Sequence, residues 1–162
     1  MPNIALKVAI NGLKQKVKDI HEGINFLKKT EVVVGIPHEN DSEHEGGLTN
    51  AELLYIQCMG SPANNIPPRN VLNAVYEDGT QEQIKACLRS GIRKAITGNV
   101  NGARQEYEKA GMVGQSAVRA RFGTIPPPNK PATVARKGSS ATLIDTGALR
   151  AAITYAVRDK KK

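Results

Sequence analysis

The sequence of 162 residues has no tryptophan and few other aromatic residues, with Phe, Tyr and Trp together making up 4% of the chain. A hydrophobic core must therefore be built from Ile, Leu, Val and Ala, and the apolar fraction of 40% is sufficient for that. Stacking on bases or sugars has few side chains to use. A chain of this length fits one domain, so we expect a single domain over residues 1–162.

Cysteine is also scarce, since Cys58 and Cys87 are the two in the chain and no Cys-x-x-Cys spacing occurs. Both lie within helical patterns, which favours reduced, buried thiols over a disulfide and indicates a reducing compartment. No apolar run of 18 residues and no N-terminal apolar signal segment is present. We therefore expect a soluble protein that is made in the cytoplasm.

Basic residues are absent from one long stretch of an otherwise basic chain. Between residues 30 and 68 there is no Lys or Arg, and six acidic residues give a formal charge of −6. The remainder has 23 basic and 9 acidic residues and carries +14, which leaves the net charge of +8. Segregated charge of this kind suits head-to-tail packing of identical subunits, or docking on charged partners, at least as well as nucleic-acid binding.

Hydrophobic periodicity predicts an amphipathic helix within residues 1–30. Its apolar residues recur at alternating steps of three and four: Ile10, Leu13, Val17, Ile20, Ile24 and Leu27. The β-branched run 31–37 then predicts a strand, and the polar segment 37–48 predicts a loop. Thr49 and Glu52 have the capping-box spacing for a short helix that ends at Gly60.

The second half of the chain begins with the proline linker, residues 61–69, which is predicted to be extended. A helix is expected from Asn70, with an interruption at Asp78-Gly79. After a turn at 97–102, a further helix over 103–122 should pack antiparallel to it.

The Pro-rich segment, residues 123–142, is predicted to be an extended arm. A helical turn and a strand follow it, with Ile153, Tyr155 and Val157 on the buried face, and residues 159–162 are expected to fray. The sequence thus predicts an α+β fold. It has a small, mostly antiparallel sheet packed against several helices, including a long helical hairpin, with an extended Pro-rich arm.

The tripeptide Asp145-Thr146-Gly147 follows two apolar residues, as the catalytic aspartate of an aspartic protease does. Such an enzyme needs two carboxylates that share a proton, each followed by a substantial β fold. No second Asp-Thr-Gly or Asp-Ser-Gly occurs, and 15 residues follow Gly147. We therefore expect Asp145 or Thr146 to cap a short helical turn that begins near Gly147.

Other chemical motifs are missing from the sequence. His38 and His44 lie among acidic and amide side chains, but neither a zinc spacing nor an EF-hand pattern surrounds them, so a solvated acidic loop is favoured and metal binding stays open. His21 is expected to be exposed. No phosphate-binding glycine loop and no serine with a neighbouring base is found. We expect no enzyme, no cofactor and no catalytic residue.

Four stretches resemble one family in their order and spacing: VVVGIP, GGLTNAELLYIQCMG, NNIPPRNVL and PPPNKPATVARKGSSATLIDTGALRAAITYAV. The chain is similar over about residues 31–158 to neck and tail-completion proteins of tailed bacteriophages, of the HK97 gp10-like and Mu virion-morphogenesis type. It departs from the family pattern at Asn70-Val71, where an aromatic residue is usual, at 57–60, which ends the short helix, and at Ala152.

The resemblance implies a structural protein of the virion that forms a hexameric or dodecameric ring between portal and tail. Its partners would be further copies of itself, portal-side connector proteins, and tail tube or tail terminator proteins, with possible non-specific contact with DNA in the channel and no membrane. Assembly would take place in the cytoplasm of the host bacterium.

Loop 37–48 and the Pro-rich segment are expected to engage neighbouring subunits, and five candidate interface residues follow: Arg69, Asn70, Lys130, Arg136 and Lys137. Two alternatives remain open. One is a basic accessory protein that binds nucleic acid, and the other is a phage assembly factor that is not retained in the virion.

Overall fold

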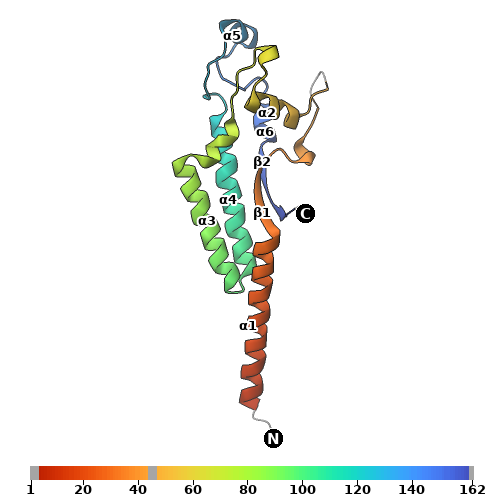
Figure 1. Cartoon of the computed structure of the whole chain (residues 1–162), viewed down its shortest axis with the longest axis vertical. Coiled ribbons are helices and arrows are strands. Elements are labelled where there is room, and N and C mark those ends of the chain that lie inside the picture. Colours follow the sequence, from red (N-terminus) through yellow and green to blue (C-terminus); the bar gives the residue numbers. More distant parts are fainter. Residues whose placement is uncertain (1–3, 44–46, 161–162) are drawn as a thin grey trace.

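The computed structural model describes residues 4–43 and 47–160 and has the α+β fold that the sequence predicts (Figure 1). The molecule is elongated, because one long helix projects from a body made of a helical hairpin, a two-stranded sheet and a cap of short helices. In chain order the elements are α1 (Ile4–Lys29), β1 (Thr30–Gly35), η1 (His38–Asn40), α2 (Asn50–Met59), η2 (Pro62–Asn64), η3 (Val71–Tyr76), α3 (Asp78–Ile96), α4 (Val100–Arg121), α5 (Pro131–Lys137), α6 (Ala148–Ala152) and β2 (Thr154–Asp159).

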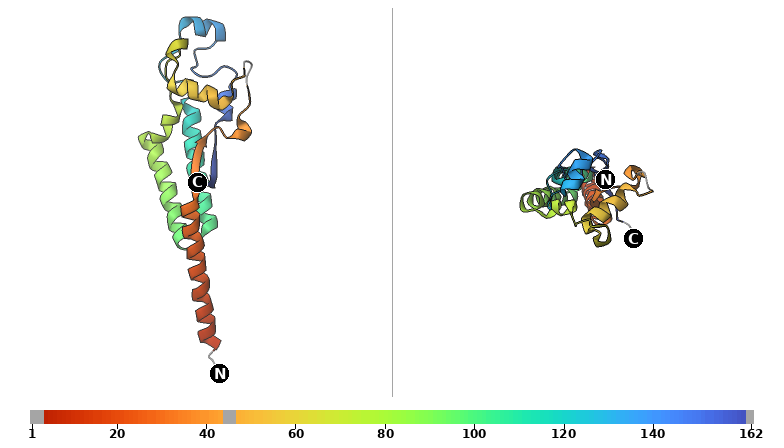
Figure 2. Two further views of the ribbon diagram at one scale, coloured as in Figure 1. Left: turned by 45° about the vertical axis from the view of Figure 1, so that its right-hand side comes forward. Right: turned by 90° about the horizontal axis from the view of Figure 1, so that it is seen from above.

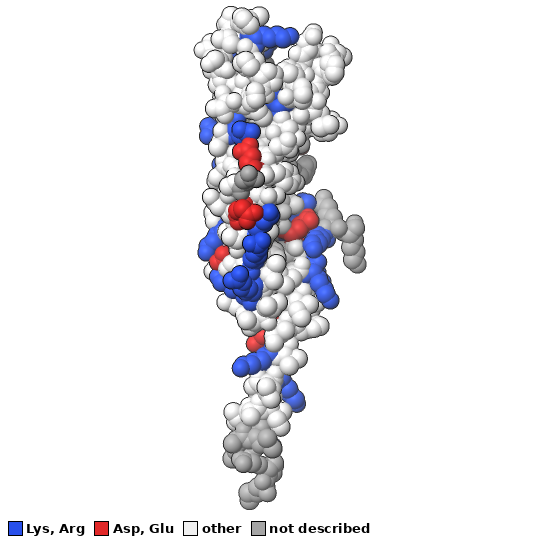
Figure 3. All heavy atoms as spheres, turned by 60° about the vertical axis from the view of Figure 1, so that its left-hand side comes forward, with Lys and Arg blue, Asp and Glu red and all other residues white. Residues whose placement is uncertain are grey.

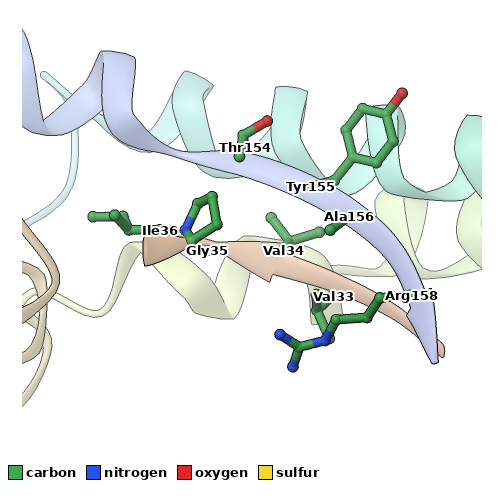
Figure 4. Close-up of a pocket in the computed structure, with 9 residues that line it drawn as sticks. Val33, Val34, Gly35, Ile36, Thr154, Tyr155, Ala156 and Arg158 are labelled. Atoms are coloured by element: carbon green, nitrogen blue, oxygen red, sulfur yellow. The ribbon is translucent and has the colours of Figure 1, made fainter. Parts of the chain in front are cut away.

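The sheet joins two segments that are far apart in sequence, since β1 and β2 pair antiparallel with Val34 opposite Tyr155. One face of the sheet packs on α4, and this explains two glycines of that helix. A Cβ atom at Gly111 would lie 2.3 Å from the Tyr155 ring, and one at Gly114 would lie 2.9 Å from Val34. Glycine therefore allows the strands to approach the helix closely. The predicted alternation of the last strand is confirmed, because Tyr155 points to α4 while Arg158 points away (Figure 4).

Helices α3 and α4 form the predicted antiparallel hairpin. Helix α4 begins at Val100, earlier than predicted, because the Asn99 side chain accepts a hydrogen bond from the Gly102 amide at 2.8 Å and caps the helix. The turn is correspondingly shorter than the predicted 97–102. At the other end, an interruption is present but lies at Glu77, between the 3-10 helix η3 and α3, so Asp78 and Gly79, where it was predicted, are the first residues of α3.

Two buried clusters hold the body together, and both are mainly aliphatic, as the composition predicts. The upper cluster lies beneath α2 and α6, and its most buried members are Val71, Val118 and Ile153. The lower cluster joins α1 to the hairpin through Phe26 and Tyr107, whose ring centroids are 5.2 Å apart. The two clusters are stacked along the hairpin.

Helix α1 is the predicted amphipathic helix, but only its C-terminal part contacts the body. Gly23 lies so close to α3 that a Cβ atom there would be 1.8 Å from the Ala95 carbonyl oxygen. The N-terminal half of α1 extends past the end of the hairpin in both views (Figures 1 and 2). Its apolar stripe is therefore left uncovered by the described residues of the chain.

The Pro-rich segment differs from the predicted extended arm. It contains α5, which begins at Pro131 and ends at Gly138 in the left-handed conformation with φ of 66°. Its two ends pair with each other, because the Gly123 amide donates to the Thr142 carbonyl at 2.8 Å. Ile125, inside the segment, is buried in the upper cluster. These contacts fold the segment back on its own chain, so it is a closed loop with a short helix.

Two smaller predictions differ as well. The proline linker contains one turn of 3-10 helix, η2, closed by pairing between Ser61 and Ile66. Asp159, expected to fray, ends β2 opposite Thr30, and the Lys160 amide donates to the Lys29 carbonyl at 2.6 Å. Residues 161–162 of the predicted tail lie outside the described residues.

Both cysteines are free thiols, as expected. Cys58 is one of the buried residues of α2, where burial raises the pKa of its thiol, and Cys87 is half-buried rather than buried. Within the described part of the chain, no helix combines the length and the apolar character needed to cross a membrane.

Candidate functional site

An open groove lies at the end of the molecule opposite the N-terminus of α1, where α5 and η2 meet in Figure 1. We call it the tip groove. The proline linker forms one side, the Pro-rich segment forms the other, and the turn at 145–147 completes it. Four of the five predicted interface residues line it, namely Arg69, Lys130, Arg136 and Lys137. The fold thus brings together two proline stretches that are far apart in sequence.

Arg69 fastens the two sides of the groove to each other. Its Nε and Nη2 atoms donate to the Pro127 carbonyl at 2.9 and 2.7 Å, and Nη2 also donates to the Pro128 carbonyl at 3.2 Å. The residue is 8% exposed, and this burial lowers the pKa of its guanidinium. The carbonyl groups of a proline-rich segment have no hydrogen-bond donors from a helix. A planar guanidinium group with several N–H donors can satisfy them. Arg69 therefore ties the two sides of the groove together within the chain, and its role at an interface stays a prediction.

Asn70 is also explained by the chain itself. Its Oδ1 accepts a hydrogen bond from the Leu72 amide at 3.1 Å and starts η3. An aromatic residue could not provide this cap, so the asparagine at position 70 has a local structural reason. Asn70 does not line the tip groove, and its side chain acts within its own chain.

The floor of the Pro-rich segment is held by two side chains, one of which the sequence reasoning missed. Asn129 Nδ2 donates to the carbonyls of Ser140 and Ala141 at 3.2 and 3.0 Å. Lys137 Nζ donates to the same Ala141 carbonyl at 3.0 Å. Asn129 follows three prolines, and that context could have indicated a loop-closing amide. These bonds leave Lys130 and Arg136 as the exposed basic side chains of the groove.

The turn at 145–147 has the local role that was predicted, with one change. Thr146 Oγ1 accepts a hydrogen bond from the Ala148 amide at 3.3 Å, and Gly147 has φ of 85°, which favours glycine. Asp145 is exposed and makes none of the capping bonds of α6. It is the single carboxylate among the described residues that line the groove. A protease dyad, which needs two adjoining carboxylates, is not assembled by these residues.

Loop 37–48 belongs to the acidic stretch between residues 30 and 68, and α2, which follows the loop, holds it in place. The predicted capping box is confirmed, since Thr49 Oγ1 accepts from the Glu52 amide and Glu52 Oε2 accepts from the Thr49 amide. Asp41 Oδ1 accepts from the Ala51 amide at 2.7 Å, and Asn50 Nδ2 donates to Ser42 Oγ at 2.9 Å. Loop 37–48 is thus tied to α2 through Asp41 and Ser42, which precede residues 44–46, and those three residues lie outside the described residues.

Metal-binding groups are not gathered in the part of the chain that the structure describes. His38 is exposed in η1, and His21 is exposed on α1, as predicted. The predicted surroundings of His44 fall outside the described residues. No cluster of three or more His, Cys, Asp or Glu side chains suitable for a metal ion occurs among the described residues.

A second, small pocket lies against the sheet (Figure 4). Its lining comes from the two strands and is largely aliphatic, and its charged member is Arg158. Arg158 Nε lies 3.0 Å from Glu31 Oε1 and is thereby engaged in an ion pair. This pocket holds no pair of acid and base that could serve a reaction.

A carboxylate shared by two lysines lies between the two hairpin helices and was missed by the sequence reasoning. Glu106 of α4 accepts hydrogen bonds from Lys94 at 2.7 Å and Lys109 at 3.0 Å. The bonds from these two ammonium groups lower the pKa of the Glu106 carboxyl. Figure 3 shows basic side chains, with a few acidic ones among them, gathered around the middle of the face that it draws. Glu106 neutralises part of the charge of Lys94 and Lys109 and acts as a structural tie.

Comparison with known proteins adds no assignment, since no protein-family model, curated protein or solved structure matches the chain.

Proposed function

We propose that the chain is a structural subunit of the head–tail junction of a tailed bacteriophage, a neck, tail-completion or tail-terminator protein that works by assembling into a ring. The resemblance of the four sequence stretches supports the junction. The observation that carries an assembly role is the uncovered apolar stripe of α1, because soluble monomers rarely expose a contiguous apolar face of that length.

Two further features support an assembly role over a catalytic one. Among the described residues that line the tip groove, the charged side chains are basic except for one isolated carboxylate. The acidic stretch and the basic remainder of the chain offer complementary surfaces to copies of the same protein. Ring closure multiplies marginal contacts of this kind into a stable assembly.

The basic rim of the tip groove is the candidate contact with an adjoining ring. Lys130 and Arg136 are exposed there, and neither makes a side-chain hydrogen bond or an ion pair within the described chain. Charge reversal at both, Lys130→Glu with Arg136→Glu, should leave the fold intact and lower the yield of joined heads and tails in complementation of a phage that lacks the gene. Arg89→Glu with Arg93→Glu on exposed positions of α3 is the matched control, with the same change in net charge.

The result separates the candidate functions. Normal particles from the groove variant would refute the role of this rim. The groove also favours the second candidate, a nucleic-acid-binding accessory protein, which predicts DNA affinity that falls steeply with salt. An assembly factor that does not stay in the particle predicts normal joining activity with no copies in purified virions.

A further inference from the structure

The uncovered stripe of α1 has the spacing of a helix-packing seam. It comprises Ile10, Leu13, Val17, Ile20 and Ile24, whose exposed fractions are 42, 64, 67, 39 and 38%. We call these residues the α1 stripe. Steps of three and four along a helix keep such side chains on one line, as in a coiled coil. Burial of this line against another surface would remove large apolar side chains from water.

The stripe is distinct from the face that α1 uses within its own chain. Gly23 contacts Ala95, and Phe26 stacks with Tyr107, so the inner face of α1 is already occupied. At 3.6 residues per turn, these inner positions lie about a third of a turn around the helix from the stripe. The stripe is therefore free for a second surface without any rearrangement of the body.

The charged side chains along both borders of the stripe restrict which kind of surface can bind it. Lys7 and Lys14 follow one border, Lys16 follows the other, and all three are exposed. The acidic residues of α1 lie away from the stripe and already have partners, since Asp19 accepts from Gln15 and Glu22 pairs with Lys18. A complementary surface needs apolar side chains edged by carboxylates. Two α1 stripes facing each other would instead bring together borders of the same charge.

The outer face of α2 has this complementary chemistry. Tyr55 and Met59 are 67 and 61% exposed and lie four residues apart on α2, so they share one side of the helix, and Leu48, 43% exposed, directly precedes the N-cap residue Thr49. We call them the α2 face. Exposed carboxylates lie on α2 and in the loop before it, Glu52 on the helix and Glu39 and Glu43 in loop 37–48, and no Lys or Arg occurs between residues 30 and 68.

We propose that the α1 stripe of one copy docks on the α2 face of a second copy of this chain. The two surfaces lie towards opposite ends of the elongated molecule, so one chain cannot pair them within itself (Figure 1). Such a contact joins different surfaces of identical subunits, and it generates a ring when the rotation closes. The inference rests on the proposed function and names the contact that would build the ring.

Two exposed positions give a test that distinguishes this contact from others. Val17→Glu places a negative charge within the α1 stripe, and Tyr55→Glu places one within the α2 face. Neither side chain belongs to the buried clusters. Each variant alone should sediment as a monomer under conditions in which the full wild-type chain assembles. An equimolar mixture should form a dimer, because Tyr55→Glu still presents a stripe and Val17→Glu still presents an α2 face.

Other outcomes overturn the inference in recognisable ways. Assembly of Tyr55→Glu alone, with Val17→Glu monomeric, would show a contact between two α1 stripes. Assembly of both variants as in wild type would refute the inference and leave the proposed ring function standing. A wild-type chain that is monomeric and absent from virions would refute both.

Charge exchange provides an independent check. Lys14→Glu with Lys16→Glu should weaken assembly by about tenfold or more, and so should Glu39→Lys with Glu43→Lys. All four changes in one chain should restore the wild-type sedimentation profile, since every contact then has its charges exchanged. Failure of the fourfold variant to recover, when both double variants are folded, would show that these charges do not face each other.

Discussion

At the scale of single residues, polar side chains hold segments that have few regular hydrogen bonds of their own. Arg69 joins the proline linker to the Pro-rich segment, and Asn129 closes that segment on itself. The side chains of Asn70 and Asn99 start helical turns by accepting hydrogen bonds from backbone amides. The tip of the molecule is therefore shaped by side-chain contacts with backbone carbonyls and amides, and less by a large core.

Replacement of Arg69 tests this directly. Arg69→Met keeps a similar volume but leaves the Pro127 and Pro128 carbonyls without their donor, which should lower the free energy of unfolding by about 1.5–3 kcal/mol. Arg136→Met, on the exposed rim of the same groove, should change it by less than about 0.5 kcal/mol. Urea denaturation of both variants measures the difference. Equal stability of the two would mean that Arg69 is no internal tie.

Glu106 gives a prediction with a pH dependence. Because hydrogen bonds from Lys94 and Lys109 lower its pKa in the folded chain, its contribution is full above the unfolded value of about 4.3 and is lost as the pH falls through the lower folded value. Glu106→Gln should thus melt a few degrees below wild type at neutral pH and converge with it in strong acid.

The control for this measurement is Glu108→Gln, two residues along α4, at a carboxylate with no ion pair among the described residues. Its melting temperature should follow wild type at every pH. A gap for Glu106→Gln that persists unchanged in acid would show that the carboxylate charge is not what stabilises the hairpin.

At the scale of elements, local signals predicted most of the fold. Periodicity gave α1, α3, α4 and the two strands, and the capping box placed α2 correctly. The path of the Pro-rich segment could not be predicted in this way, because Pro127 and Pro128 are held by Arg69, more than fifty residues away in sequence. No single sequence pattern predicts the tip groove, although four of the residues that line it were predicted as interface candidates. What each candidate contacts is a tertiary property.

The packing of α1 on the hairpin offers a test with an internal control. Gly23→Ala would place a methyl group against the Ala95 carbonyl and should destabilise the chain by about 1–3 kcal/mol. Gly12→Ala, at a position with nothing within 4 Å, should instead stabilise it by up to about 1 kcal/mol through helix propensity. Thermal unfolding compares the two. Stabilisation by both substitutions would mean that α1 is not seated on α3.

At the scale of the whole molecule, the chain is elongated, with an amphipathic helix whose apolar stripe is uncovered at one end and a groove with a basic rim at the other (Figures 1 and 2). An acidic segment that lacks any Lys or Arg provides a surface complementary to the basic remainder. Surfaces of this kind gain a function when copies or partners cover them. This is the physical basis for proposing an assembly subunit rather than a catalyst.

The most direct measurement is a count of the chain in purified virions by quantitative mass spectrometry, combined with imaging of isolated head–tail junctions. We expect about six or twelve copies of the chain per virion, as in a closed cyclic assembly, and we expect them between portal and tail. Virions that are complete and infectious yet contain no copies of the chain would contradict it.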